Sequence, residues 1–256
     1  MNRATGGMPP VLEAYLTTSQ IAASVEVVGH TVNLKKEEAS VSESRAIVDP
    51  EEILSYWFPP GYDADPETLR QQVVRWFQGG PEVAQEITEL FSPVLEQARR
   101  GELDWWAETP RGRLALIIVL DQFSRTVYRG TPLAYAQDPA ALQLAQSGIA
   151  EGMERDLTLD ERLFFTLPFA HAEGPDLPER GDWMVRQGEE MVELAPPHLR
   201  GIYEHSLSQA KAHREVIVRF GRHPHRNEVL GRTSTPEELE YLRTETPVHL
   251  RRPPQQ

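Results

Sequence analysis

The amino-acid sequence predicts an all-α fold, built as an array of consecutive antiparallel helices with short loops. A capping Asp or Thr followed by proline recurs along the chain. In this pattern the side-chain oxygen accepts from free amides of the first turn, and proline takes the first helical position, where its missing N–H costs nothing. After residue 49 no stretch shows a convincing strand pattern. The capping pairs are Asp49-Pro50, Asp65-Pro66, Thr109-Pro110, Asp138-Pro139 and Thr235-Pro236.

Four helices are expected in the first half of the array, at 49–58, 66–77, 81–100 and 110–128. The third of them carries an apolar stripe at helical spacing and ends before Gly101, a residue that adopts a left-handed cap easily. The stripe consists of Val83, Ile87, Leu90, Phe91, Val94, Leu95 and Ala98.

The helix at 110–128 is apolar nearly all round as far as Leu120, so we expect it to be central and buried. Its apolar run, residues 114–120, would also suit a strand. The length of the segment, its start at Thr109-Pro110 and the lack of turn residues before Arg129-Gly130 favour a helix.

Five more helices, about nine in all, are expected at 139–152, 159–172, 182–195, 197–220 and 236–243. Thr158 and Glu161 have the spacing of a capping box at the start of the second of these. Pro168 should kink or end that helix and leave His171 and Glu173 in irregular backbone. No 34-residue period stands out, so the sequence itself does not support a regular repeat protein.

The chain divides into three parts by composition. Residues 1–48 form an extension with room for a short helix at 11–23 and a weak hairpin at 24–34, and it is expected either to be mobile or to pair with a partner or cover the domain. Residues 49–243 form the helical domain, and residues 244–256 form a flexible tail.

The composition of the 256 residues excludes several classes of function. A net charge of −13 disfavours bulk binding to nucleic acid or to an anionic membrane. The absence of cysteine excludes a disulfide scaffold, a thiol nucleophile and a zinc–thiolate site. The longest apolar run is far shorter than the roughly 20 residues that a membrane span requires, and the N-terminus carries no secretory signal. The sequence therefore predicts a cytoplasmic protein.

A basic island with four histidines, residues 205–235, interrupts this acidic chain. Arg222 and Arg226 lie in a turn with His225 and Asn227, and a guanidinium can bind carboxylate or phosphate through two hydrogen bonds. The alternative is that these arginines neutralise acids elsewhere in the fold, or helix C-termini. Six cations in the island face only three acids, Glu204, Glu215 and Glu228; the cations are Lys211, Arg214, Arg219, Arg222, Arg226 and Arg232.

Other polar residues, most of them outside this island, could also take part in chemistry. Asp121 directly follows the apolar run and is costly to bury unless it is paired, with Arg125 and Arg129 close by in sequence. His171 and Glu173 could both reach one proton or one ion, and His213 lies on the long helix before Gly221. The alternatives are a structural ion pair for Asp121, a hydrogen-bonded structural role for His171 and a core position for His213.

Several motifs of the chain resemble those of a known protein family. They are Tyr56-Trp57-Phe58, Trp76-Phe77, the turn from Gly101 to Trp105, the run from Leu114 to Phe123 with Arg125 and Arg129-Gly130, Leu167-Pro168-Phe169 with His171 and Glu173, and His213 followed by Arg219 to Arg222, Pro224 to Asn227, Leu230 to Arg232, Ser234-Thr235 and Glu237-Glu238. With them, residues from about 50 to 243 resemble the bacterial DUF924 family, a domain of unknown function. The resemblance implies a TPR-like superhelix, with the N-terminal extension outside the family domain, and it implies no established activity.

Three functions are compatible with these residues. The first is an enzyme or binding protein for a small anionic molecule, with His171, Glu173, His213 and Asp121 as catalytic groups and with ligand contacts from Arg125, Arg129, Arg222, His225, Arg226 and Asn227. The second is a TPR-like interaction module that clamps a peptide carboxylate, with the N-terminal extension in its groove at rest. The third is a metal site made by His171, Glu173, His213 and His225.

These patterns leave the cofactor open. Neither nucleic acid nor a membrane is expected as a partner, and apolar helix arrays of this kind often pair into homodimers.

Overall fold

The computed structural model describes residues 49–245, and over this range it contains helices and no strands, which confirms the all-α prediction. The α5–α6 helix is continuous through η2, and only Leu167 separates α8 from α9, so this part of the chain forms the nine helices expected. The helical elements are α2 (Pro50–Trp57), α3 (Pro66–Gln78), α4 (Pro81–Arg99), η1 (Asp104–Glu108), α5 (Pro110–Ile117), η2 (Ile118–Phe123), α6 (Ser124–Val127), η3 (Pro132–Ala134), α7 (Asp138–Glu151), η4 (Met153–Asp156), α8 (Leu159–Thr166), α9 (Pro168–His171), α10 (Leu177–Leu194), α11 (Arg200–Phe220), η5 (Pro224–Arg226) and α12 (Pro236–Thr244).

Most of the predicted caps are present. The carboxylate of Asp65 accepts from the backbone amides of Glu67 and Thr68 at 2.9 and 3.0 Å, with Pro66 at the first helical position. Thr158 closes its capping box with Glu161 as predicted. The cap predicted at Asp138 is wrong, because Asp138 is itself the first residue of α7 and its carboxylate binds two arginines instead.

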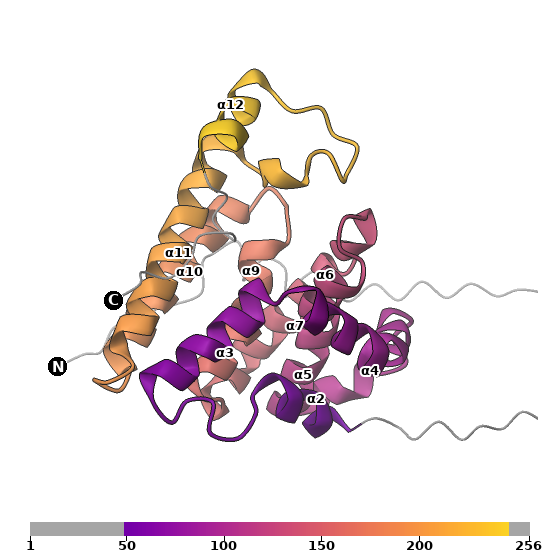
Figure 1. Ribbon diagram of the computed structural model, residues 1–256, viewed down its shortest axis with the longest axis vertical. Coiled ribbons are helices and arrows are strands. Elements are labelled where there is room, and N and C mark those ends of the chain that lie inside the picture. The colour runs from indigo at the N-terminus through magenta and orange to yellow at the C-terminus, as the bar shows by residue number, and fades with distance from the viewer. Residues whose placement is uncertain (1–48, 246–256) are drawn as a thin grey trace, which may run out of the picture.

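The helix made by α5 and η2 lies at the centre of the domain, as its apolar sequence predicts (Figure 1). Its residues 114–120 are all buried. α2 and α7 pack against α5, and α4 packs against η2 and α6. The core therefore surrounds this helix, and any polar residue at its end is removed from water.

The central helix contains a π-helical stretch that the sequence does not predict. Over Ile118–Phe123 the backbone changes from α to π hydrogen bonding, in which each N–H reaches one residue further back. The stretch includes Asp121 and Gln122. A π turn rotates the side chains that follow it relative to a regular helix, and such turns occur often at functional sites.

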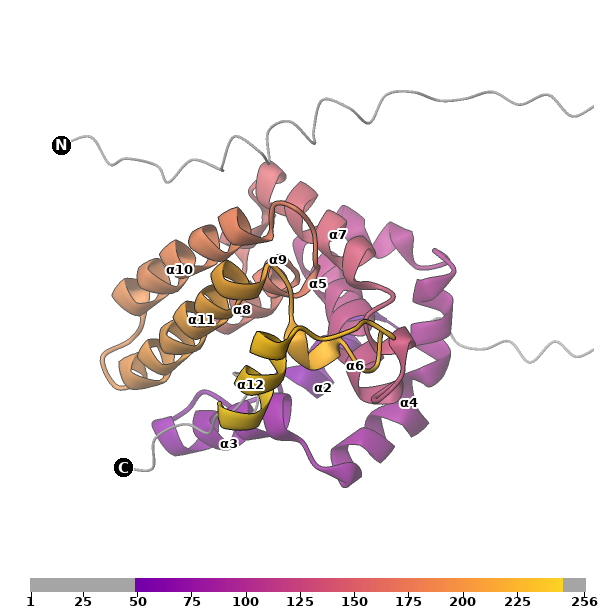
Figure 2. The same cartoon turned by 90° about the horizontal axis from the view of Figure 1, so that it is seen from above.

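The C-terminal part of the domain is a pair of long helices with a returning segment. α10 and α11 pack against each other along their lengths (Figures 1 and 2). Gly221, with φ of +69°, ends α11. Residues 221–235, which we call the return segment, then run back over α9 toward α6 and α7 before α12 begins (Figure 2). Tyr241 of α12 and Val216 of α11 share a small second core.

Other boundaries and positions differ from the sequence predictions. α10 begins at Leu177 rather than 182, because Pro178 occupies an early helical position that tolerates proline. Pro168 does not leave His171 in irregular backbone. Leu167 stays helical, the His171 amide donates to the Leu167 carbonyl at 3.2 Å, and His171 is the last residue of α9.

One residue of the apolar stripe and the two ends of the chain remain to be compared with the sequence predictions. Leu90, placed in the buried stripe of α4, is 56% exposed. The helix and hairpin predicted within 1–48 lie outside the described residues, as does the predicted tail from 246 onward.

Candidate active site

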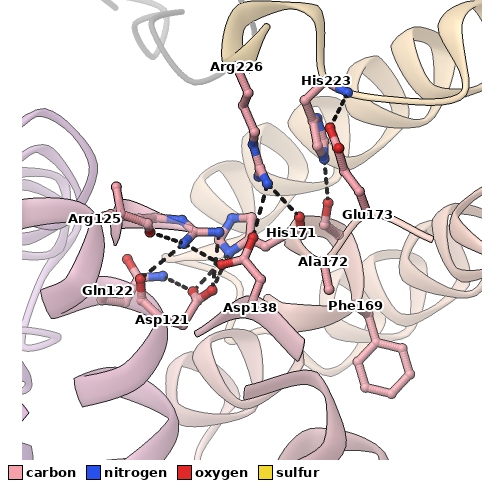
Figure 3. A network of polar contacts seen from close by, with 12 residues as sticks. Asp121, Gln122, Arg125, Asp138, Phe169, His171, Ala172, Glu173, His223 and Arg226 are labelled. Carbon is pink, nitrogen blue, oxygen red and sulfur yellow. Dashed lines mark hydrogen bonds and ion pairs between the residues drawn. The ribbon is translucent and has the colours of Figure 1, made fainter. Parts of the chain in front are cut away.

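Asp121 of η2 and His171 of α9 form a hydrogen-bonded pair (Figure 3). The Nδ1 atom of His171 lies 2.9 Å from Oδ1 and 2.8 Å from Oδ2 of Asp121. The π turn of the central helix provides Asp121, and the C-terminus of α9 provides His171. Gln122 also donates to the Asp121 carboxylate. The carboxylate is thus fixed from two sides.

The environment of this pair determines the charge state of each of its two members. Burial alone would raise the pKa of Asp121, but the charge of Arg125 and the contact with His171 outweigh it, so the pKa lies well below its ordinary value. Burial lowers the pKa of His171, Asp121 opposes this effect, and Arg125 adds to it. Near neutral pH an ionised Asp121 therefore faces a neutral imidazole. Because the carboxylate can only accept, Nδ1 is the protonated nitrogen and Nε2 carries a lone pair.

The Nε2 atom of His171 has no hydrogen-bond partner among the described residues, and the side chain is 19% exposed. This is the arrangement of a general base: a carboxylate orients one ring nitrogen and the other is left for a reacting group. A structural histidine in a buried site would normally use both nitrogens.

Two arginines and a second aspartate extend the pair. Arg125 contacts Oδ1 of Asp121 at 3.3 Å and donates to Oδ1 of Asp138 at 2.8 Å. Arg226 donates to Oδ2 of Asp138 at 2.9 Å and, through the same nitrogen, to the carbonyl oxygen of His171 at 2.9 Å. Both guanidiniums lie over the ring of Tyr135, at 5.5 and 4.4 Å from its centroid.

These contacts close a ring. It runs from the His171 imidazole through Asp121, Arg125, Asp138 and Arg226, and returns to the His171 carbonyl (Figure 3). We call these residues the dyad ring. Its two carboxylates and two guanidiniums sum to zero charge while His171 is neutral. Its residues come from the continuous α5–α6 helix, from α7, from α9 and from the return segment, so the site exists only in the folded domain.

The C-terminal carbonyls of α9 are also satisfied by side chains. Arg180 donates to the carbonyls of Phe169 and Ala172 at 2.6 and 2.8 Å. The buried His223 donates from Nε2 to the Ala170 carbonyl at 3.0 Å, and Arg226 donates to the His171 carbonyl. Cationic donors at a helix C-terminus complement the helix dipole. The end of α9, and with it His171, is thus held from two directions.

Glu173 does not pair with His171. Its carboxylate accepts from the backbone amide of His223 at 2.8 Å and forms an ion pair with Arg232. The hydrogen bond from Arg232 and its charge lower the pKa of Glu173, although burial opposes the shift. Glu173 therefore ties the return segment to the loop after α9, and the proton partner of His171 is Asp121.

The remaining predicted residues divide between three places. Arg222 and Asn227 both donate to Glu238 of α12 and hold the return segment to that helix. His213 and His225 flank His223, with ring centroids 6.2 and 5.6 Å from its ring. Arg129 is exposed and makes no ion pair with the dyad ring among the described residues.

Each cation of the basic island has an acidic partner within the described chain. The partners lie outside the island, which explains how a basic island is accommodated in an acidic protein. The pairs are Lys211 with Glu189, Arg214 with Asp182, Arg219 with Glu237, Arg222 with Glu238, Arg226 with Asp138, and Arg232 with Glu173.

A search of residues 49–245 finds no three His, Asp or Glu side chains placed to hold a metal ion, so the geometry adds nothing to the metal alternative. Over the same residues, no helix has the length and apolar character needed to cross a membrane.

Sequence reasoning missed four members of this network. Asp138 was assigned to a cap, and Arg180, His223 and Gln122 were not singled out. The proximity of Gln122 to Asp121 is a local signal that could have found it. The backbone carbonyls to which Arg180 and His223 donate are 8 to 53 residues away, and no local pattern marks them.

Comparison with known proteins places the chain. The family model described as "Bacterial protein of unknown function (DUF924)" matches residues 53–246. The chain belongs to the DUF924 family. A solved structure of a protein of unknown function from Agrobacterium tumefaciens is 35% identical in sequence, with a TM-score of 0.57. The match covers 77% of this chain and 97% of that one. No curated protein matches the chain. The TPR-like superhelix implied by the resemblance stays a prediction.

Proposed function

We propose that this DUF924 protein is an enzyme that transfers a proton to or from a small anionic substrate at Nε2 of His171. The observation that carries this proposal is the Asp121–His171 pair, in which Nδ1 is bound to a buried carboxylate and Nε2 has no partner among the described residues. The location of Asp121 on a π turn supports it as well.

The roles of the two residues follow from their charge states. Neutral His171 accepts a proton at Nε2, and the ionised Asp121 stabilises the imidazolium that results, because the two charges are opposite and 2.8 Å apart. When the proton is returned to the product, the same nitrogen acts as a general acid. Asp121 stays ionised throughout, since its pKa is held low.

The charge of the dyad ring supports an anionic substrate. Protonation of His171 changes the ring from neutral to a charge of +1, and an adjacent monoanion restores neutrality in this buried setting. Nη2 of Arg125 is a buried donor that lies 3.3 Å from Oδ1 of Asp121 as an ion pair but makes no hydrogen bond with the described residues. Buried donors are nearly always satisfied, and an anionic group would satisfy this one.

The ligand contacts expected from Arg222 and Asn227 are not included in this proposal, because both side chains already bind Glu238. Arg125 and His171 remain as the residues proposed to contact substrate. His213 and His225 are proposed only to line the approach to His223 and its neighbours.

The proposal is tested by substrate discovery with matched variants. The full-length protein is incubated with a bacterial extract of polar metabolites, and consumption of each compound is followed by mass spectrometry. Wild type should consume a compound that is anionic at neutral pH. H171Q should reduce the rate by about 10²–10⁴-fold, the usual contribution of a general acid–base.

The control is H198Q, since His198 is an exposed histidine in the loop before α11. It should consume the same compound at the wild-type rate. Equal consumption by wild type and H171Q would refute the proposal, and so would the absence of any compound consumed by wild type.

A further inference from the structure

Arg226 joins the return segment to the dyad ring. Its side chain is buried, with 5% of its surface exposed, and a single nitrogen, Nη1, donates both to Asp138 and to the His171 carbonyl. Arg125 holds the other carboxylate oxygen of Asp138 and also contacts Asp121. The backbone and the imidazole of His171 are therefore linked through the same chain of charges.

We propose that Arg226 is a positioning residue that sets the proton affinity and the orientation of the His171 imidazole. The proposal rests on the proposed function, in which His171 moves the proton. It assigns to the return segment a part in the reaction: the segment completes the site when it lies over α9.

The physical reason is competition for Arg125. With Arg226 in place, Asp138 is shared by two guanidiniums, and Arg125 is free to neutralise part of the charge on Asp121. Without the cation at 226, Asp138 is left to Arg125 alone and draws it away from Asp121. The charge of Asp121 then acts on His171 with less compensation and favours the imidazolium.

Charged groups near His171 come from several elements packed around α9, among them Arg180 of α10, which donates to the carbonyls of Phe169 and Ala172. Asp121 and Arg125 come from the central helix, and Asp138 comes from α7. His223, in the return segment, carries no charge, since burial and the charge of Arg226 hold its pKa well below the ordinary value. Removal of Arg226 thus changes the balance at His171 by one positive charge.

The test is side-chain ¹⁵N NMR of histidine-labelled full-length protein, titrated with pH. R226M should raise the midpoint of His171 protonation by about one pH unit, a tenfold gain in proton affinity. R226K keeps the positive charge and should shift the midpoint by less than R226M does, although its shorter side chain loses the stacking of the guanidinium on Tyr135. R226Q serves as a second neutral variant and should shift the midpoint in the same direction as R226M.

R222M is the matched control. Arg222 also fastens the return segment, through two hydrogen bonds to Glu238, but it lies outside the dyad ring. If R222M and R226M shifted the midpoint equally, the effect would come from loosening the segment and the proposal would be overturned. An unchanged midpoint in folded R226M or R226Q, or a shift in R226K as large as that in R226M, would overturn it too.

These outcomes separate the two proposals. The midpoint and tautomer of His171 are measured without substrate, so a null result at Arg226 leaves the proton-transfer function standing. Conversely, a wild-type protein that consumes no metabolite, as tested above, refutes the function without altering the expected NMR shift.

Discussion

The imidazole of His171 and the carboxylate of Asp121 lie 50 residues apart in the chain and 2.8 Å apart in the folded protein. Two unusual features of the backbone bring them together. A π turn in the central helix carries Asp121, and the short helix α9, which continues α8 past Pro168, ends at His171. The pair and the fold that holds it give several testable predictions.

Replacement of Asp121 by Asn should leave His171 without the charge that stabilises its protonated form. Since Asp121 raises the pKa of His171, D121N should lower it further, and the rate with the discovered substrate should fall by about 10²-fold or more. The pH profile of the rate and the NMR titration of His171 measure the two effects. An unchanged rate with a normal fold would show that Asp121 has only a structural role.

Replacement of Glu238 by Gln should detach the return segment from α12. Glu238 accepts from Arg222, Asn227 and the amide of Thr235, and E238Q should cost about 1–3 kcal/mol in the free energy of unfolding. E237Q is the control, because Glu237 makes an exposed ion pair with Arg219 and should change stability by less than about 0.5 kcal/mol.

The same residue predicts acid sensitivity. The hydrogen bond from Arg222 holds the pKa of Glu238 at about 2 in the folded protein, against an ordinary value of 4.5. A lowered pKa contributes stability that is complete above the ordinary value and is lost as pH falls toward the folded one. Urea unfolding between these limits should therefore show a smaller difference between wild type and E238Q as the pH falls. A constant difference would contradict this account.

Replacement of Asp160 by Asn should stabilise the protein at neutral pH. This carboxylate is buried, accepts from the hydroxyls of Tyr203 and Tyr62 at 3.0 and 3.1 Å, and has no cationic partner among the described residues. Burial raises the pKa of Asp160. The contribution of this carboxyl group to stability is therefore complete below its ordinary pKa and is lost as the pH rises through the raised pKa.

Asn stays neutral and can still bond both hydroxyls, so D160N should gain about 1 kcal/mol near pH 7 and nothing near pH 3. Urea unfolding at the two pH values measures this gain. A loss of stability at neutral pH would contradict the prediction.

Replacement of Gly148 by Ala should force α7 away from its neighbours. A Cβ at this position would clash with the ring of Phe165 and would lie 3.0 Å from Cδ of Arg113. G148A should therefore cost about 1–3 kcal/mol, as overpacking does. G201A is the matched control: Gly201 has nothing within 4 Å, and Ala there should gain up to about 1 kcal/mol. Thermal unfolding of both variants measures these changes, and equal changes in stability would contradict the prediction.

The fold could be predicted from local signals. Asp65-Pro66 and the Thr158–Glu161 box marked helix starts because caps act within one turn. The apolar run before Asp121 marked the central helix, because burial on all sides needs apolar residues on all sides. Leu90 is an exception: it has the right spacing, but its side chain is exposed although Ile87 and Phe91 of the same helix are buried.

The candidate site was only half predictable. Asp121, His171 and Arg226 are conspicuous by residue type, but no sequence pattern indicates that they lie together. Asp138 carried the signal of a cap, and an aspartate before proline looks the same whether its carboxylate turns to its own helix or to an arginine 88 residues away. Which acid pairs with which base is decided by packing between elements, and no local pattern records it.

The most direct test of the central claim is the tautomer of His171 in the wild-type protein, measured by side-chain ¹⁵N NMR near neutral pH. We predict a neutral ring with the proton on Nδ1 and the lone pair on Nε2, and a midpoint of protonation below the ordinary value for histidine. A proton on Nε2, or an imidazolium at neutral pH, would contradict the account, because His171 would then have no lone pair with which to accept a proton from the substrate.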